Sequence, residues 1–206
     1  NNMPTDVYEY NEAVYQDHVL VPYHLIETST KITDDGLTYE KLDEEEREQY
    51  EDEFCEDDGL VDHIPPEKIN TYIFNRDTVD IMISDLMNHG IKHKNGNHVG
   101  KTIIFAQNKR HAKYIIERFD VLYPQYKGAF CKLVVCDEPY AEKNLEDFKK
   151  PDEYPFITVT VDMLETGVDV PEITNLVFAK KVYSRIKFEQ MIGRGTRLCE
   201  NLFGEG

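Results

Sequence analysis

The second half of the chain alternates continuous apolar runs with stretches of helix-forming composition. The apolar runs occupy residues 101–106, 132–136, 156–161 and 175–179. The helix-forming stretches occupy residues 109 to about 123, 141–148 and 184–192. Strands that are apolar runs rather than alternations belong to parallel sheets that are buried on both faces. The pattern therefore predicts an α/β fold in which helices cover both faces of a parallel sheet.

The first half has a weaker pattern. Residues 19–26 alternate apolar and polar positions and are rich in β-branched residues, which predicts a strand. Composition and capping residues predict helices over 12–18, 43–54, 67–75 and 78–87. His89 and Gly90 form a stop signal after the last of these helices. We expect a small acidic α+β segment over 1–67 and the parallel-sheet domain over 68–206, with 1–32 either separate or part of that domain.

Charge divides the chain in the same way. The sequence has 40 acidic and 23 basic residues and a net charge of -17, and its first 60 residues hold 19 of the acidic ones and 3 of the basic ones. This balance excludes a histone-like binder, but the nearly neutral remainder leaves room for a local basic groove. We interpret the acidic run of residues 40–58 as a solvated excursion. The alternative is a surface that binds a partner subunit or keeps DNA off that side.

Other features of the sequence concern compartment and metal. No run of 18 apolar residues is present, and the first residues lack a signal-peptide pattern. The four cysteines are scattered, which is typical of a reduced cytoplasmic protein. The seven histidines show no spacing that suggests a zinc site, so we expect no metal ligands in this chain.

The most informative string is FEQMIGRGTR at residues 188–197. It places Gln190, Gly193, Arg194 and Arg197 at the spacing Q-x-x-G-R-x-x-R. If a helix continued through this string, the glutamine and both arginines would lie near one face. Two guanidinium groups on one edge suit a polyphosphate, because each planar fork pairs with phosphate oxygens. The alternative is a pair of surface arginines in ordinary ion pairs.

A second string, VDMLETGVDVP at residues 161–171, follows a predicted strand. Gly167 and Pro171 indicate a sharp loop at the carboxyl end of that strand, where open α/β sheets bind ligands. Asp169 in this loop could accept hydrogen bonds from a ribose or orient an arginine. The alternative is a turn in which the aspartate is only a cap.

A third string, IIFAQN at residues 103–108, ends another strand. Gln107 and Asn108 could contact a phosphate backbone through amide donors and the helix N-terminus behind them. The alternative for Asn108 is a plain helix cap, and the two roles are compatible. Lys109, Arg110 and Lys113 follow on the predicted helix and line either a DNA groove or a solvated face.

Together these strings resemble motifs IV, V and VI of superfamily 2 helicases and translocases. "VDMLETGVDVPE" and "FEQMIGRGTRLC" are similar to the R (motor and restriction) subunit of type I restriction-modification enzymes, and the similarity covers about 1–32 and 68–204. The resemblance implies the second RecA-like domain of an ATP-driven translocase on double-stranded DNA. Many relatives have a threonine before the aspartate of motif V, where this chain has Val161. At this position only the main chain could then contact the DNA backbone.

The resemblance also implies roles for individual residues. Arg194 and Arg197 would act on the ATP phosphates across the cleft between two RecA-like domains, and Gln190 and Gly193 would shape that contact. Gly167 and Asp169 would lie beside the nucleotide and couple it to the DNA track. The expected DNA-binding residues are Gln107, Asn108, Lys109, Val161 and Asp162.

Two motor motifs are absent from the sequence. It has no G-x-x-x-x-G-K-[ST] phosphate loop and no D-E-x-H string. A first RecA-like domain of the same polypeptide is therefore expected to supply the phosphate loop and the Mg²⁺ carboxylates. The other implied partners are double-stranded DNA and the methyltransferase and specificity subunits. We expect the chain alone neither to hydrolyse ATP nor to cut DNA.

Two alternatives stay open from sequence alone. The chain could be the second motor domain of another superfamily 2 protein, such as a type III restriction subunit or an RNA/DNA helicase. It could also be a binding module without catalysis, whose arginines only hold nucleic acid.

Overall fold

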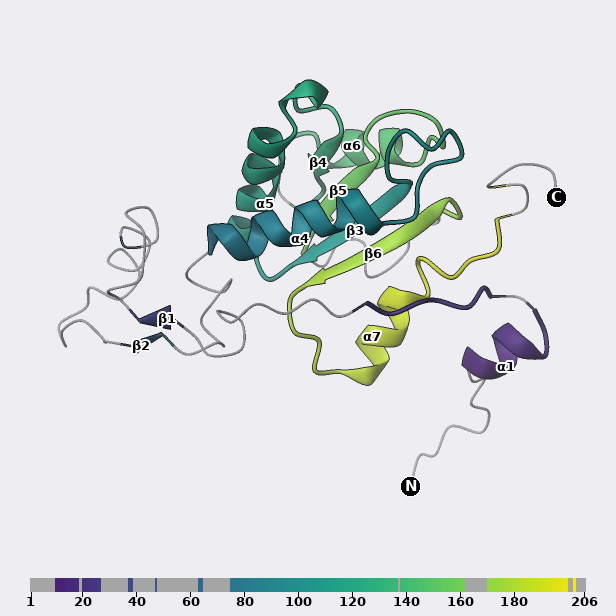
Figure 1. Ribbon diagram of the computed structural model, residues 1–206. Coiled ribbons are helices and arrows are strands. Elements are labelled where there is room, and N and C mark those ends of the chain that lie inside the picture. Colours follow the sequence, from purple (N-terminus) through teal and green to yellow (C-terminus); the bar gives the residue numbers. More distant parts are fainter. Residues whose placement is uncertain are drawn as a thin grey trace.

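The computed structural model describes the parallel-sheet domain and short parts of the N-terminal segment (Figure 1). The described residues are 10–18, 20–26, 37–38, 47, 63–64, 75–136, 138–161, 170–199 and 202. The N-terminal elements are α1 (Tyr10–Tyr15) and the antiparallel pair β1 (Leu37–Thr38) and β2 (His63–Ile64). The domain contains α4 (Arg76–His89), β3 (Lys101–Ala106), α5 (Lys109–Leu122), a 3₁₀ turn (Pro124–Tyr126), β4 (Cys131–Leu133), α6 (Ala141–Phe148), β5 (Ile157–Thr160), β6 (Ile173–Ala179) and α7 (Arg185–Ile192).

The four domain strands form one parallel sheet in the order β4-β5-β3-β6. Within it, Phe105 of β3 is opposite Thr160 of β5 and Phe178 of β6. The carboxyl ends of these three strands therefore meet at one edge of the sheet, which we call the carboxyl edge. The predicted parallel sheet is confirmed.

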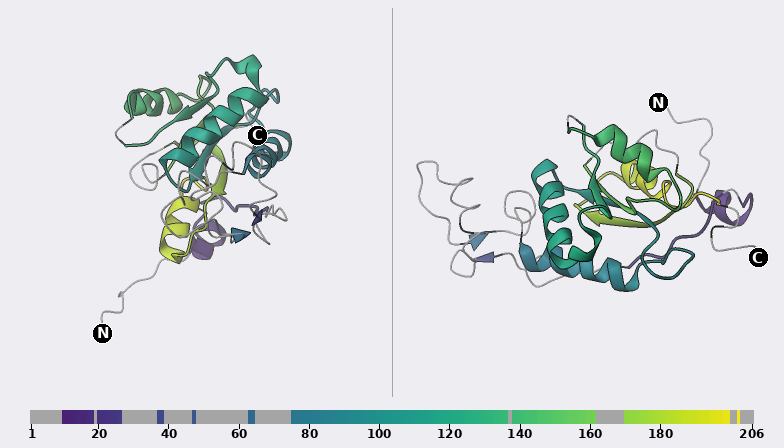
Figure 2. Two further views of the ribbon diagram at one scale, coloured as in Figure 1. Left: turned by 90° about the vertical axis from the view of Figure 1, so that its left-hand side faces the viewer. Right: turned by 90° about the horizontal axis from the view of Figure 1, so that it is seen from above.

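Alternate side chains of each strand build two separate cores. Ile104 and Ala106 of β3 belong to the cluster that contains the buried residues of α4 and α5. Ile103 and Phe105 belong to the other cluster, which contains Phe148 of α6 and Met191 of α7. Helices thus cover both faces of the sheet, as predicted (Figure 2).

The helix ends follow their sequence signals. Asn75 caps α4 and accepts a hydrogen bond from the Thr78 N–H at 2.8 Å, while Asn108 caps α5 and accepts from the His111 N–H at 2.8 Å. Gly90 ends α4, as the stop signal predicts. The predicted helix over 141–148 is confirmed at both ends.

Several predicted bounds were wrong. The strand expected over 19–26 is not a sheet strand, because within the described residues 20–26 only Leu20 makes a bridge, to Arg197. Residues 22–26 are exposed, and Pro22 has no N–H to donate, so this stretch lacks both a buried face and a full set of donors. The strand expected over 132–136 covers only Cys131–Leu133, and that expected over 175–179 begins at Ile173.

The remaining differences lie near the N-terminus. The helix expected over 12–18 covers Tyr10–Tyr15. The helices expected over 43–54 and 67–75 fall outside the described residues, apart from the single helical residue Arg47 and the cap Asn75.

Candidate nucleotide and DNA site

Helix α7 carries the first part of the FEQMIGRGTR string and is fixed against the sheet by apolar side chains. Met191 is fully buried in the second core, and the ring of Phe188 lies 5.4 Å from that of Phe178 on β6. The Ser184 hydroxyl caps the helix and accepts a hydrogen bond from the Lys187 N–H at 3.3 Å. Gln190 is exposed on the last turn.

The helix ends at Ile192, which is its predicted end, so Gln190, Arg194 and Arg197 do not share one helical face. Gly193 is the C-cap, and the Arg194 and Gly195 N–H groups bond to the Met191 and Ile192 carbonyls at 3.1 and 2.9 Å. These bonds span three residues, which is typical of a tight final turn. Two glycines in three positions disfavour a longer helix. The arginines therefore lie on a turn and on the extended stretch after it.

This turn packs tightly against β6, the outer strand of the sheet. A Cβ atom added to Gly195 would lie 3.0 Å from both Cγ and Cδ1 of Leu176 on β6, closer than ordinary side-chain contact allows. Thr196 is buried, and its hydroxyl donates to the Ile192 carbonyl at 3.4 Å. The glycine thus lets the backbone approach the sheet and fixes the position from which the arginines extend.

The N-terminal segment holds the other side of the same turn. The Val21 N–H donates to the Thr196 carbonyl at 2.8 Å, and Leu20 forms an antiparallel bridge with Arg197. Leu20 in turn donates its N–H to the Ala13 carbonyl at 3.2 Å, and Ala13 is buried. A segment that is distant in sequence thereby orders the backbone at Arg197.

Both arginines are half-buried in this setting. The Nε atom of Arg194 is inaccessible to solvent. Half-burial on a fixed backbone restricts the directions in which the two side chains can extend. Arg185, at the start of α7, differs from them, because it is exposed and its Nε lies 2.7 Å from Oε1 of Glu189 on the same helix. It has the ordinary surface ion pair that the alternative interpretation expects.

Gln107, Asn108 and Lys109 lie at the carboxyl edge, where β3 passes into α5. Gln107 is exposed, whereas the Asn108 side chain accepts the hydrogen bond that caps α5. Lys109 pairs with Glu138 at 2.7 Å, and Lys113 pairs with the same carboxylate at 2.8 Å. The two lysines hold the pKa of Glu138 below its usual range. Part of the positive charge expected here is therefore balanced within the chain.

From the sequence alone, no role was assigned to His111, which accepts a hydrogen bond from the backbone at the end of β3. Its side chain is fully buried, and Nδ1 accepts a hydrogen bond from the Gln107 N–H at 3.3 Å. Burial lowers its pKa to about 4, so the imidazole is neutral near pH 7. The only signal in the sequence was its place four residues after Gln107.

The structure describes only the start of the VDMLETGVDVP loop. Val161 follows β5 and is half-buried, and its carbonyl accepts a hydrogen bond from Lys180 Nζ at 2.8 Å. Asp162, Gly167 and Asp169 lie outside the described residues. Gln107 and Val161 are brought to one edge of the sheet by neighbouring strands, and Lys180, just after β6, joins them there.

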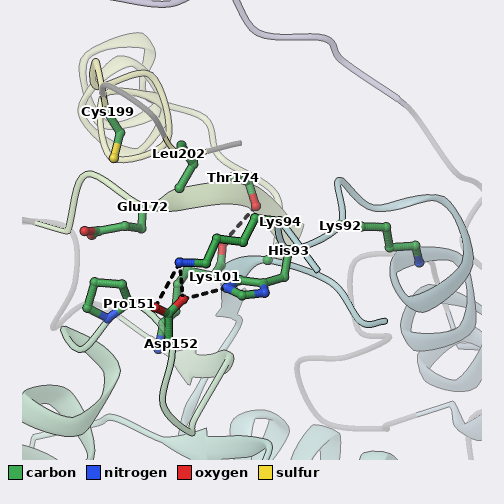
Figure 3. Close-up of a pocket in the computed structure, with 11 residues that line it drawn as sticks. Lys92, His93, Lys94, Lys101, Pro151, Asp152, Glu172, Thr174, Cys199 and Leu202 are labelled. Atoms are coloured by element: carbon green, nitrogen blue, oxygen red, sulfur yellow. Dashed lines mark hydrogen bonds and ion pairs between the residues drawn. The ribbon is translucent and has the colours of Figure 1, made fainter. Parts of the chain in front are cut away.

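A cavity of about 160 Å³ lies at the opposite edge, where β3 and β6 begin (Figure 3). Its cationic side chains are already engaged. Lys101 donates to the Glu153 and Pro155 carbonyls, each at 2.8 Å, and burial lowers its pKa to about 8. His93 and Lys94 both contact the Asp152 carboxylate, at 3.0 and 2.9 Å. Because these cations already contact groups of the chain itself, we do not assign an anion site to this cavity.

Comparison with known families agrees with the fold. The family described as the helicase conserved C-terminal domain matches residues 78–199, which is more than half of the chain. The chain therefore belongs to this family, and its parallel sheet has the RecA-like fold of a helicase C-terminal domain.

Within this family the chain is homologous to endonuclease subunits of type I restriction enzymes. It is 43% identical over 107 residues to the EcoKI endonuclease subunit of Escherichia coli strain K12, a match that covers 48% of this chain and 9% of that protein. It is 31% identical over 111 residues to the EcoAI endonuclease subunit of Escherichia coli, covering 52% and 14%. The chain thus spans only a small part of the length of these relatives.

A solved structure supports the same relationship. The fragment structure of a chain described as an HsdR subunit of a type I restriction enzyme from Vibrio vulnificus YJ016 superposes with a TM-score of 0.52 at 26% identity. The superposition covers 63% of this chain and 27% of that one. The family resemblance predicted from the three strings is confirmed.

Membrane and metal features are absent from the described part of the chain. Within it, no helix is both long and apolar enough to cross a membrane. The described residues also hold no group of three or more His, Cys, Asp or Glu side chains arranged to bind a metal ion.

Proposed function

We propose that the chain is the second RecA-like domain of an ATP-dependent translocase on double-stranded DNA, the motor of a type I restriction enzyme. The observation that carries this proposal is the turn at residues 193–197. It joins a helix anchored by the buried Met191, a glycine packed on Leu176 and a bridge to Leu20, and it presents two arginines on a fixed backbone. Homology to the type I endonuclease subunits supports the same assignment.

In this proposal the arginines act on ATP that is bound mainly by another domain. Arg194 and Arg197 pair with phosphate oxygens, and in the transition state they neutralise the charge that develops on the transferred group. Gln190 and Gly193 shape that contact, and Gly167 and Asp169 lie beside the nucleotide. Fixed positions matter because a preorganised charge needs no rearrangement during reaction.

The Mg²⁺ that accompanies ATP in such motors is not assigned to this chain. The described residues hold no carboxylate cluster for it, and the sequence has no phosphate loop. We propose that a first RecA-like domain of the same polypeptide supplies both. The chain alone then neither hydrolyses ATP nor cuts DNA.

Gln107, Asn108, Lys109, Val161 and Asp162 are the proposed DNA contacts. Support comes from the sheet register, which brings the ends of β3 and β5 to one edge, and from the exposure of Gln107. The further proposed partners are the methyltransferase and specificity subunits, and the proposed compartment is the cytoplasm, where such a motor meets DNA.

The test is the DNA-stimulated ATPase of the full-length parent protein with Arg197→Ala. Loss of an arginine that acts across a motor cleft lowers the rate by roughly 10³-fold or more. Arg76→Ala is the matched control, because Arg76 is an exposed arginine at the start of α4. DNA affinity is measured in parallel and is expected to stay unchanged. An unchanged ATPase in Arg197→Ala would contradict the proposal and favour a binding module without catalysis.

A further inference from the structure

The connection between β6 and α7 is unusually basic for this acidic chain. Residues 180–187, which we call the basic segment, read KKVYSRIK and contain four cations and no acid. No Asp or Glu occurs between residues 173 and 188. The whole chain carries a net charge of -17, so this concentration of positive charge is local.

The basic segment is also exposed and rich in apolar surface. Lys181, Arg185 and Lys187 are exposed, and between them Tyr183 is 87% and Ile186 is 69% exposed. Large apolar side chains that stand in solvent beside cations are typical of contact surfaces rather than of a solvated face. Tyrosine hydroxyls and basic side chains are common ligands of the DNA backbone.

The basic segment adjoins the carboxyl edge. Lys180 leaves the end of β6 and its Nζ donates to the Val161 carbonyl at the end of β5, 2.8 Å away. Gln107 follows β3, the strand between them. The basic segment therefore continues the row of strand ends on which the proposed DNA contacts lie.

The other basic group of the domain differs in its charge balance. Lys109 and Lys113 share the carboxylate of Glu138, with contacts of 2.7 and 2.8 Å. The basic segment carries four cations, and the first acid that follows it in sequence is Glu189, which pairs with Arg185 at 2.7 Å. With Arg110, the start of α5 holds three cations against one paired acid, a net of +2, whereas the basic segment with Glu189 holds four cations against one acid, a net of +3.

We propose that the basic segment is a second contact to the DNA backbone, in which Lys181, Arg185 and Lys187 bind phosphates and Tyr183 packs against the sugar-phosphate chain. It extends the DNA track from the strand ends onto the N-terminal end of α7. Since α7 leads directly into the turn that carries Arg194 and Arg197, the contact places the DNA at the start of the helix whose end leads to the arginines. This inference rests on the proposed function, because it assumes a DNA track.

The test uses the full-length parent protein and a fluorescently labelled DNA duplex without a recognition site. Affinity is measured by anisotropy over a series of salt concentrations for Lys181→Gln and for Lys181→Gln combined with Lys187→Gln. Each lost phosphate contact lowers the slope of log affinity against log salt by about 0.9. The single variant should therefore lower the slope by about 1 and the double variant by about 2. Tyr183→Ala should weaken binding without changing the slope, since tyrosine releases no counterion.

Lys127→Gln is the matched control. It makes the same charge change at an exposed lysine in the turn before β4, away from the carboxyl edge. It is expected to leave both affinity and slope unchanged. If the basic-segment variants behave like this control, the inference is overturned.

A protein partner is the other outcome of the same experiment. If the variants leave DNA binding intact but raise the KM for ATP, the basic segment faces another domain, and the inference is also overturned. Arg197→Ala, assayed in parallel, separates the two proposals. Loss of ATPase in Arg197→Ala with normal DNA binding in the basic-segment variants refutes this inference alone, whereas normal ATPase in Arg197→Ala refutes the proposed function.

Discussion

Acid should destabilise the domain through His111, and the size of the effect follows from its burial. The side chain is fully buried, and its pKa is about 4, against an ordinary value of 6.5. Below pH 6.5 the unfolded chain binds a proton that the folded chain does not take up until the pH approaches 4. Stability therefore falls as pH decreases through this window and is unaffected above it.

The magnitude can be worked from the two pKa values. One unit of pKa difference corresponds to about 1.4 kcal/mol, and the linkage relation gives a loss of about 2 kcal/mol between pH 7 and pH 5. That is a large share of the roughly 5–15 kcal/mol that is typical of a folded domain. His111 alone should thus make the domain markedly less stable in mild acid.

Urea unfolding at pH 7 and pH 5 tests this with His111→Asn. The amide oxygen of the introduced asparagine can still accept the Gln107 N–H but does not titrate. The free energy lost between the two pH values should be about 2 kcal/mol smaller in the variant than in the wild type. His24→Asn, which makes the same substitution at an exposed histidine, is the matched control. An identical pH dependence in wild type and His111→Asn would show that His111 does not cause the loss of stability in acid.

Two further predictions concern packing, and both are checked by urea unfolding. Gly195→Ala should destabilise the domain by about 1–3 kcal/mol, because its methyl group would clash with Leu176. Leu176→Ala in the same chain should recover part of that loss, and additive losses would contradict this explanation. Thr158→Val should stabilise by about 1 kcal/mol, because the buried Thr158 hydroxyl has no hydrogen-bond partner among the described residues. Thr102→Val should instead destabilise, because the Thr102 hydroxyl donates to the Gly100 carbonyl at 2.8 Å; equal effects at both threonines would refute the distinction.

The sheet was predictable because its strands depend on local composition. Apolar runs such as 101–106 are long enough to form strands that are buried on both faces. Asn108 and Gly90 mark helix ends because of their own side-chain or backbone preferences. The family motifs were equally visible, since they are contiguous strings. These features need no knowledge of distant contacts.

Features that depend on distant contacts were not predictable. Lys101 begins an apolar run and is 1% exposed, because its ammonium group meets two carbonyls that are distant in sequence. Arg197 does not share a helical face with Gln190, because Gly195 must approach Leu176 and the backbone then pairs with Leu20. The buried role of His111 likewise arises only once α5 is packed on the sheet.

Separate measurements of ATP binding and of the chemical step show whether Arg197 acts on the transition state of ATP hydrolysis. In the full-length parent protein, kcat with saturating DNA and the equilibrium Kd for ATP are measured for wild type, Arg197→Lys and Arg197→Ala. We expect kcat to fall by roughly 10³-fold or more in Arg197→Ala while the Kd for ATP changes little. Arg197→Lys should recover kcat only partly, because lysine lacks the planar fork. A raised Kd for ATP with an unchanged kcat would contradict this expectation and show that Arg197 contributes only to the binding of ATP.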